Sequence, residues 1–432
     1  MKKVIHLLII ILSIPYFKAQ KSDIKPRILI STDIGGTDPD DNQSMIHLLM
    51  YADKFNIEGL VSSPSFGNGS KSEILKMIDF YEKDLPKLKK HAKGFPTPKY
   101  LRSVSKQGLH GNAPFEGFSK PTEGSEWIVK SARKKSEQPL WVLVWGGLED
   151  VAQALHDAPD IKNKIKIYWI GGPNKKWSAN SYAYIVKNFP DLWFIEVNST
   201  YYSFFSKNND TNILKSTDYY DQYIKGYGAM GKDFKNYYGG EVKMGDSPTL
   251  FYLMHGNPED PTGESWGGSW GGSFEKINRT PHLILDGTKG SSEDIAFCSL
   301  IEFRFKGPAL KENPTSAPFH METMHKKDVQ KWNGTYLGNG NYALYYVPKN
   351  AEVLNYKFVS EIPELNGFEG KLNIVNSFPG KENPTDIKLG NTWFTDKSDP
   401  NLYDGKFQGG KTISKWKNEI LLDWAKRWEW LK

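Results

Sequence analysis

The chain of 432 residues is 38% hydrophobic, 25% charged and 14% aromatic. That length suffices for one large α/β domain with an appendage or for two medium domains, and the composition excludes a disordered chain. The formal net charge of +6 is spread along the sequence, so nucleic-acid binding has little support.

Residues 1–20 have the pattern of a secretory signal peptide. Two lysines, Lys2 and Lys3, precede an apolar run at 4–14 and a short polar exit. The apolar run is too short to span a membrane comfortably, and no cysteine near the expected cleavage point could carry a lipid. We therefore expect a secreted or periplasmic protein without a membrane anchor. The single cysteine, Cys298, lies in an apolar run and is expected to be a buried hydrophobic residue.

Short apolar runs alternate with helical patterns from Arg27 to Asn198, which predicts an α/β fold with a mostly parallel sheet and flanking helices. In such sheets, ligands bind beyond the carboxyl ends of the strands. The expected elements, in chain order, are strand 27–31, helix 42–55, strand 57–61, helix 73–81, strand 140–145, helix 151–155, strand 165–170 and strand 192–197.

Beyond residue 286 the pattern becomes β-rich and indicates a small β-sandwich, with expected strands at 295–305, 340–347, 353–358 and 371–375. Residues 414–431 return to helical spacing, and we expect this helix to pack on the α/β domain. The expected organisation is a signal peptide at 1–20, an α/β domain at 25–280, a β-rich accessory region at 286–390 and a C-terminal helix at 410–432.

An acidic run follows the first expected strand. Residues 31–41 read Ser-Thr-Asp-Ile-Gly-Gly-Thr-Asp-Pro-Asp-Asp and bring together the carboxylates of Asp33, Asp38, Asp40 and Asp41. These groups repel one another unless a cation joins them, and oxygen ligands favour calcium or magnesium. Calcium tolerates the irregular cage that several loops would supply. The alternative is a solvated turn in which Asp40 or Asp41 caps the next helix.

This run resembles the nucleoside hydrolase signature, in which a strand ends in Asp-x-Asp-Pro-Gly-x-Asp-Asp and the carboxylates bind calcium and ribose. The resemblance implies that Asp33 is a metal ligand and the catalytic base, that Asp40 binds sugar hydroxyls, and that Asp41 is a second metal ligand. The run departs from the signature because Ser31 replaces the first Asp, Ile34 replaces the Pro, and a few extra residues lengthen the loop.

Two later segments are similar to metal-binding segments of the same family. Residues 146–152, Gly-Gly-Leu-Glu-Asp-Val-Ala, are similar to Gly-Pro-Leu-Thr-Asn-Val-Ala, in which the Thr gives calcium its backbone carbonyl. Glu149 stands at that place. Residues 245–250 resemble the late His-Asp-x-Leu segment, so the resemblance implies that Asp246 is a calcium ligand. The alternative for Asp246 is a helix N-cap before Pro248.

Further segments resemble the sugar-binding positions of the family. Gly67-Asn68 is similar to its Gly-Asn after the second strand, and 196–198, Glu-Val-Asn, resembles its Glu-Phe-Asn. The resemblance implies that Asn68, Glu196 and Asn198 hold the sugar. The alternatives are a turn residue for Asn68 and an ordinary strand end for the other two.

A closer resemblance is to the Sde182-like subgroup of nucleoside-hydrolase-like proteins, described as cellulose-binding. Four segments show this resemblance: residues 172–175, residues 189–193, the Gly/Trp loop at 266–272 and the helix at 416–428. The resemblance covers roughly residues 27–275 and the last helix. Trp faces stack on sugars or bases, so Trp266 and Trp270 are predicted to contact the substrate beside the scissile bond.

One departure from the nucleoside hydrolase pattern bears on the substrate. Nucleoside hydrolases carry a His before the late Asp to help a purine base leave, whereas this chain has Gly245, which argues against purine nucleoside cleavage. His47, His110 and His255 are candidate substitutes, although a lone His is more often structural.

The sequence thus predicts an exported, calcium-dependent hydrolase that cleaves a glycosidic bond, N- or O-linked, by water attack at the anomeric carbon. The expected partner is a carbohydrate, such as a furanoside or glycan fragment, or a nucleoside-like small molecule, and a homo-oligomer is compatible with the sequence. The alternative is a carbohydrate-binding protein that keeps the fold and performs no hydrolysis. A calcium-dependent phosphoesterase is a third, weaker reading.

Overall fold

The computed structural model describes residues 25–205, 216–271, 278–325, 327–376 and 378–432. The expected signal peptide at 1–20 lies outside the described residues. Within the described part of the chain, no helix is long and apolar enough to cross a membrane.

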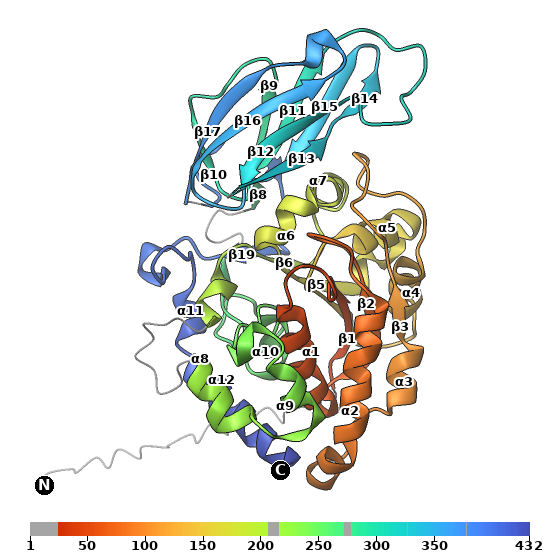
Figure 1. The fold of residues 1–432 in the computed structure, drawn as a ribbon, viewed down its shortest axis with the longest axis vertical. Coiled ribbons are helices and arrows are strands. Elements are labelled where there is room, and N and C mark those ends of the chain that lie inside the picture. The colour runs from red at the N-terminus through yellow and green to blue at the C-terminus, as the bar shows by residue number, and fades with distance from the viewer. Residues whose placement is uncertain (1–24, 206–215, 272–277, 326, 377) are drawn as a thin grey trace, which may run out of the picture.

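An eight-stranded central sheet forms the body of the molecule, in the order β3-β2-β1-β4-β5-β6-β19-β7 (Figure 1). Every neighbouring pair is parallel except β19 and β7, so the predicted mostly parallel sheet is confirmed. The strands are β1 (Arg27–Thr32), β2 (Asn56–Ser62), β3 (Ser105–Gln107), β4 (Leu140–Val144), β5 (Ile165–Ile170), β6 (Phe194–Val197), β7 (Trp270–Gly271) and β19 (Trp393–Asp396).

Helices cover both faces of this sheet, because alternate residues of a strand point to opposite faces. On β1, Ile28 and Ile30 pack in one apolar core with α1, α2, α9, α10 and α12, whereas Leu29 packs in a second core with α4, α5 and α7. The helices are α1 (Asp40–Met50), α2 (Lys71–His91), α3 (Pro98–Ser103), α4 (Glu123–Ala132), α5 (Glu149–Asp157), α6 (Gly172–Trp177), α7 (Ala179–Asn188), α8 (Ser216–Tyr219), α9 (Gly228–Phe234), α10 (Pro248–Met254), α11 (Lys411–Ser414) and α12 (Lys417–Trp428).

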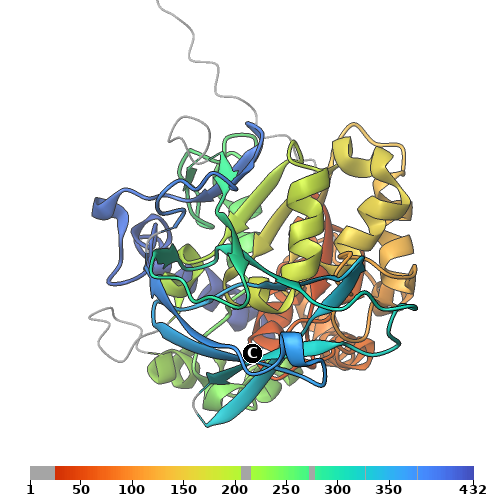
Figure 2. The same cartoon turned by 90° about the horizontal axis from the view of Figure 1, so that it is seen from above.

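Two further sheets pack on one another at one end of this body, next to α6 and α7 (Figures 1 and 2). Their orders are β10-β17-β16-β12-β13 and β14-β15-β11-β9, and we call them together the β-sandwich. Its apolar core also takes in Ala179 and Ala183 of α7, so the sandwich is seated on the body. The strands are β9 (His282–Asp286), β10 (Asp294–Ala296), β11 (Leu300–Lys306), β12 (Phe319–His325), β13 (Asp328–Asn333), β14 (Thr335–Gly338), β15 (Asn341–Tyr346), β16 (Val353–Ser360) and β17 (Glu369–Val375), and a separate small sheet pairs β8 (Arg279–Thr280) with β18 (Ile387–Lys388).

The end of the chain returns to the body twice. Strand β19 is inserted between β6 and β7 in the central sheet, and α12 then places Trp424 and Trp428 in the apolar core below it. Arg427 of α12 binds the buried carboxylate of Asp53 with an N–O distance of 2.7 Å. The C-terminal segment therefore contributes both a strand and a helix to the α/β body.

Several elements differ from the expected bounds. Helix α2 runs through Pro86 to His91, because Leu85 and Leu88 continue its buried apolar stripe past residue 81. The run at 295–305 is divided into β10 and β11 at Cys298, whose φ of 60° interrupts an extended strand. Strand β19 was not expected from the sequence pattern.

Candidate functional site

A cavity of about 550 Å³ opens at the carboxyl edge of the central sheet, and we call it the acidic cavity. Its wall is made by the segments that follow β1, β2, β4, β5 and β6, together with a late segment that includes Lys243 and Asp246. Lys349, from the turn between β15 and β16 of the β-sandwich, also lines it. Segments far apart in the sequence meet here because the carboxyl ends of parallel strands share one edge.

Three carboxylates converge in this cavity. Asp40, Asp41 and Asp246 each offer an oxygen within 4.8 Å of the other two. Asp41 and Asp246 are each only 3% exposed. Hard oxygen ligands at this spacing fit a divalent cation such as calcium or magnesium, so these residues could hold a metal ion.

Burial and mutual repulsion disfavour the charged forms of these acids. Burial raises the pKa of Asp33 to about 6 and the pKa of Asp40 to about 8. It also raises the pKa values of Asp41 and Asp246 well above the ordinary range, and repulsion by Asp33 and Asp40 adds to this effect. A buried acidic cluster of this kind is stabilised when a cation shares its oxygens. The chemistry of the donor set therefore fits a metal ion.

Hydrogen bonds from α1 and β1 hold the acidic residues in place. The Thr32 hydroxyl donates to Oδ1 of Asp41. The Ser44 hydroxyl donates to Oδ2 of Asp246 at 3.3 Å, and the backbone N–H of Asp246 donates to the Ser44 hydroxyl oxygen at 3.3 Å. Oε1 of Gln43 accepts the backbone N–H of Lys243 at 2.8 Å. Two successive residues of α1, Gln43 and Ser44, thus hydrogen-bond to the segment that contains Lys243 and Asp246.

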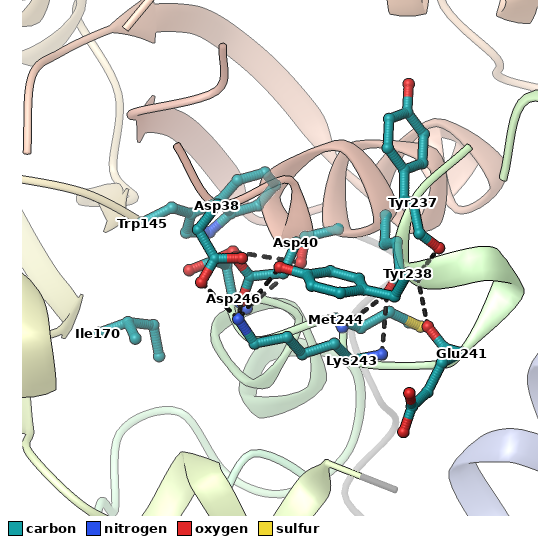
Figure 3. A network of polar contacts seen from close by, with 12 residues as sticks. Asp38, Asp40, Trp145, Ile170, Tyr237, Tyr238, Glu241, Lys243, Met244 and Asp246 are labelled. Atoms are coloured by element: carbon teal, nitrogen blue, oxygen red, sulfur yellow. Dashed lines mark hydrogen bonds and ion pairs between the residues drawn. The ribbon is translucent and has the colours of Figure 1, made fainter. Parts of the chain in front are cut away.

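Lys243 is the cationic side chain beside the carboxylates. Its Nζ donates to Oδ2 of Asp38 at 2.5 Å and lies 3.5 Å from Oδ2 of Asp40. It also donates to the Tyr238 hydroxyl at 3.2 Å, and Figure 3 shows its side chain directed at the acidic residues. These carboxylates in turn raise the pKa of Lys243, which keeps the ammonium charged.

Aromatic rings form much of the remaining wall. Phe66 stacks on Trp177 with ring centroids 4.4 Å apart, and Tyr202 and Phe205 meet edge to face at 5.4 Å. Phe66 is 47% exposed, so an apolar ring is open to solvent at this wall. Flat apolar faces next to hydrogen-bonding carboxylates suit a sugar, which has an apolar face and a polar rim.

Residues 27–273 match the family model described as cellulose-binding Sde182, nucleoside hydrolase-like domain. The chain belongs to this family. Its match spans more than half of the sequence and includes Asp33, Asp40, Asp41 and Asp246. The predicted resemblance is therefore confirmed. No curated protein shows a significant sequence match to the chain.

Solved structures of similar fold include a nucleoside hydrolase-related protein of Saccharophagus degradans that is associated with carbohydrate metabolism, at 18% identity and TM-score 0.47, covering 81% of this chain and 100% of that one. The inosine-uridine preferring nucleoside hydrolase of Bacillus anthracis matches at 15% identity and TM-score 0.38, over 60% and 87% of the chains. The purine-preferring ribonucleoside hydrolase of Gardnerella vaginalis matches at 13% identity and TM-score 0.32, over 55% and 81%. The Sde182-like family match and the sheet topology together establish the α/β fold of the chain.

The acidic run of this Sde182-like chain lines the acidic cavity as a group. Asp33 lies in the turn between β1 and α1, Asp40 and Asp41 are the first two residues of α1, and Asp246 lies in the turn before α10. Asp40, predicted to bind sugar, lies in the carboxylate cluster with Asp41 and Asp246.

Glu149, predicted to offer its backbone carbonyl to the metal, is the first residue of α5 and is absent from the cavity wall. A helical carbonyl at that position points toward the N–H four residues onward. Its carboxyl group is buried, and Oε2 has no hydrogen-bond partner among the described residues. Burial raises the pKa of Glu149 to about 8. The metal-ligand role of Glu149 stays a prediction.

Glu196 and Asn198 lie at the end of β6 but do not line the acidic cavity. Oε1 of Glu196 accepts Nζ of Lys175 at 2.7 Å, and both side chains are almost fully buried. Oε2 accepts the Tyr182 hydroxyl at 2.8 Å, and Nδ2 of Asn198 donates to Oε1 at 2.9 Å. The four side chains form a buried polar network, in which Oδ1 of Asn198 has no hydrogen-bond partner among the described residues. The sugar contacts of Glu196 and Asn198 stay a prediction.

Asn68, Trp266 and Trp270 are also absent from the wall. Asn68 is exposed nearby, where its Oδ1 accepts the backbone N–H of Gly111 at 2.7 Å. Trp266 and Trp270 are 8% and 0% exposed, and both pack in the main apolar core. The predicted stacking of these two Trp rings on substrate stays a prediction that their burial disfavours.

Any side chain at position 245 requires the Asp40 carboxylate to move. A Cβ atom on Gly245 would lie 2.2 Å from Oδ2 of Asp40. A histidine at this place therefore needs another conformation of the Asp40 side chain. His47, His110 and His255 do not line the cavity either.

Several residues of the wall were not predicted from the sequence. Lys243 stands two residues before the glycine of the late motif, and Asn174 lies within the Gly-Pro-Asn-Lys phrase, so both had a local indication in the sequence. Nδ2 of Asn174 donates to the carbonyls of Trp145 and Ile170, each at 3.0 Å, and so joins the ends of β4 and β5. Trp177 and Lys349 had no such indication.

Proposed function

We propose that this protein is an exported, calcium-dependent hydrolase that cleaves a glycosidic bond by direct attack of water at the anomeric carbon. The substrate we propose is a furanoside or a glycan fragment. One observation carries the proposal: Asp40, Asp41 and Asp246 meet in a cavity at the carboxyl edge of the sheet, beside aromatic rings.

Asp33 is proposed as the general base. It lines the cavity, and its pKa of about 6 lies close to neutral pH, where a base can both be deprotonated and accept a proton from water. Calcium held by Asp40, Asp41 and Asp246 would supply positive charge that makes a nearby water easier to deprotonate. Asp33 then takes the proton as the water oxygen attacks the anomeric carbon, the glycosidic bond breaks, and the leaving group takes a proton from solvent water.

The carboxylates also suit the transition state of glycoside cleavage. Positive charge develops on the sugar ring, and the carboxylates of the cavity stabilise it electrostatically. The ammonium group of Lys243 holds the Asp40 side chain in place and neutralises part of the negative charge of its carboxylate. Because water attacks without a covalent sugar–enzyme intermediate, the product should have the inverted anomeric configuration.

No histidine lines the described wall of the cavity, and position 245 is a glycine, so histidine-assisted release of a purine base has no donor there. This observation bears on purine release by histidine alone, because the leaving oxygen of an O-glycoside also takes a proton. The second candidate function is binding of a carbohydrate without hydrolysis, because the family model carries the description cellulose-binding.

The test is a panel of nucleosides, pentofuranosides and plant-wall oligosaccharides, incubated with calcium or with a chelator. Wild type is compared with Asp33→Asn and with the matched control Asp328→Asn, an exposed aspartate of β13. We expect turnover of at least one glycoside that is lost with chelator and with Asp33→Asn and kept in the control. Saturable glycan binding that persists without calcium, with no turnover on any substrate, would establish the binding function instead.

A further inference from the structure

A second cavity, of about 610 Å³, lies between the α/β body and the β-sandwich, and we call it the interdomain cleft. One side is formed by the segment around Asn112 and Phe115 with the start of α7, and the other by β13, β14 and the stretch before β12. Small-molecule sites have volumes of roughly 300–1,000 Å³. The cleft is therefore large enough for a ligand of its own.

Trp177 connects the two cavities. Its side chain, at the end of α6, lines both the acidic cavity and the interdomain cleft. It stacks on Phe66 at 4.4 Å, toward the acidic cavity, and on Trp332 of the β-sandwich at 5.7 Å, toward the cleft. The β-sandwich also reaches the acidic cavity through Lys349. A chain molecule with one end in the acidic cavity could thus extend past Trp177 into the cleft.

The wall of the cleft has the chemistry that recognises neutral sugars. Exposed amides of Asn112, Asn313 and Asn333 offer donors and acceptors, and Phe115, stacked on Tyr345 at 4.4 Å, offers an apolar ring. The charged residues of the wall are Glu116, Lys176 and Lys331. Nζ of Lys176 donates to Oε1 of Gln330 at 2.7 Å and lies 4.6 Å from the centre of the Trp332 ring, and Lys331 is paired with Glu322 at 3.1 Å. Because both ammonium groups already have partners, the wall favours an uncharged ligand over a phosphate or an acidic peptide.

We propose that the interdomain cleft binds successive units of a neutral oligosaccharide whose terminal unit occupies the acidic cavity. The β-sandwich is then the part of the protein that selects chain length. The position of the terminal unit rests on the proposed function, whereas binding in the cleft can be measured without any turnover.

The experiment is calorimetric titration of the Asp33→Asn protein, in calcium, with β-1,4-linked glucan and xylan oligosaccharides of increasing length. Two cleft variants are added to this background. Asn112→Ala with Asn333→Ala removes two exposed amides, and Thr335→Trp places a bulky ring in the cleft from the edge strand β14. The matched control is Asn355→Ala, an exposed asparagine of β16 outside the cleft.

We expect affinity in one of the two series to rise about tenfold from one unit to four in the background and in the control, and both cleft variants to abolish this rise. Circular dichroism verifies that each variant is folded, and the paired alanine variant tests the proposal if Thr335→Trp does not fold. Affinity that is independent of length, a rise that persists in the paired alanine variant, or no binding by either series would overturn the proposal. Turnover of simple aryl glycosides by the wild type tests the hydrolase separately.

Discussion

Gly245 and Asp40 approach one another so closely that a Cβ atom at position 245 would lie 2.2 Å from Oδ2 of Asp40. Asp40 is the first residue of α1, and Gly245 lies about two hundred positions later in the chain, in the turn before α10 and next to the cavity residue Asp246. The glycine thus permits Asp40 to reach Asp41 and Asp246.

Replacing this glycine tests the contact. Gly245→His should not create nucleoside cleavage, because the imidazole must displace Asp40 from the carboxylate cluster. We expect turnover of the glycoside substrate to fall about 100-fold or more, since small displacements of catalytic groups have effects of this size. Steady-state kinetics would measure it. Gly290→Ala is the control, because a Cβ atom there meets nothing within 4 Å. Nucleoside turnover by Gly245→His would contradict the prediction.

Stability should depend on pH and calcium together. Asp33 and Asp40 have pKa values of about 6 and 8 in the folded protein, above their ordinary value of 3.8. A carboxyl group with a raised pKa favours folding while it is protonated, so without metal this contribution is complete below about pH 4 and is lost as the pH rises through 6 and 8. We expect the Tm of the chelated protein to fall over that range.

Calcium should reverse that loss, and more strongly at pH 8 than at pH 5, because protons compete with the cation for the same oxygens. Thermal unfolding with calcium and with chelator at both pH values would measure this difference. Asp41→Asn should reduce the calcium-dependent rise in Tm, whereas Asp328→Asn should keep it. An equal calcium effect at the two pH values would count against the carboxylate cluster as the metal site.

Lys243→Met removes the ammonium that lies 3.5 Å from Asp40. In the absence of calcium the variant should lose about 1–3 kcal/mol in the free energy of unfolding at pH 8, because mostly buried carboxylates then lack a positive partner. Saturating calcium should restore most of the loss. Urea unfolding with and without calcium would measure both effects. Lys225→Met, which breaks the exposed pair with Asp221, should have almost no effect. A loss of stability that calcium does not reduce would show that Lys243 does not stabilise the protein through the carboxylate cluster.

Glu196→Gln distinguishes a structural role from sugar binding. The variant leaves the Lys175 ammonium, whose side chain is fully buried, without its carboxylate partner. We expect a loss of about 3–5 kcal/mol in the free energy of unfolding with no change in KM. Asp160→Asn, which breaks the exposed pair with Arg133, should cost less than about 1 kcal/mol. A raised KM at unchanged stability would instead support the predicted sugar contact of Glu196.

The parts of the site that could be predicted from sequence are those with a local pattern. Asp33, Asp40 and Asp41 follow a buried strand within one short run, and their mutual repulsion indicates a cation without knowledge of the rest of the fold. Asp246 was added because residues 245–250 resemble the late His-Asp-x-Leu segment of nucleoside hydrolases. The strands and helices of the body were predictable because short apolar runs alternate with helical spacing.

What could not be predicted depends on contacts between distant segments. Strand β19 has only four residues and no periodic pattern. It pairs with β6 although all strands of the β-sandwich lie between the two in the sequence. Glu196 lies near the end of β6, as expected, but its carboxylate is paired with the buried ammonium group of Lys175. Lys349 reaches the acidic cavity, and Trp177 of α6 meets the interdomain cleft, only because the β-sandwich is seated at that edge of the body.

The most direct test of the hydrolase is a proton NMR time course on a glycoside substrate, which follows the anomeric configuration of the first product with calcium and after chelation. The proposed chemistry predicts that the inverted anomer appears first, that chelation stops the reaction, and that Asp33→Asn does the same. Release of the retained anomer, or turnover that continues at the same rate after complete removal of calcium, would contradict it.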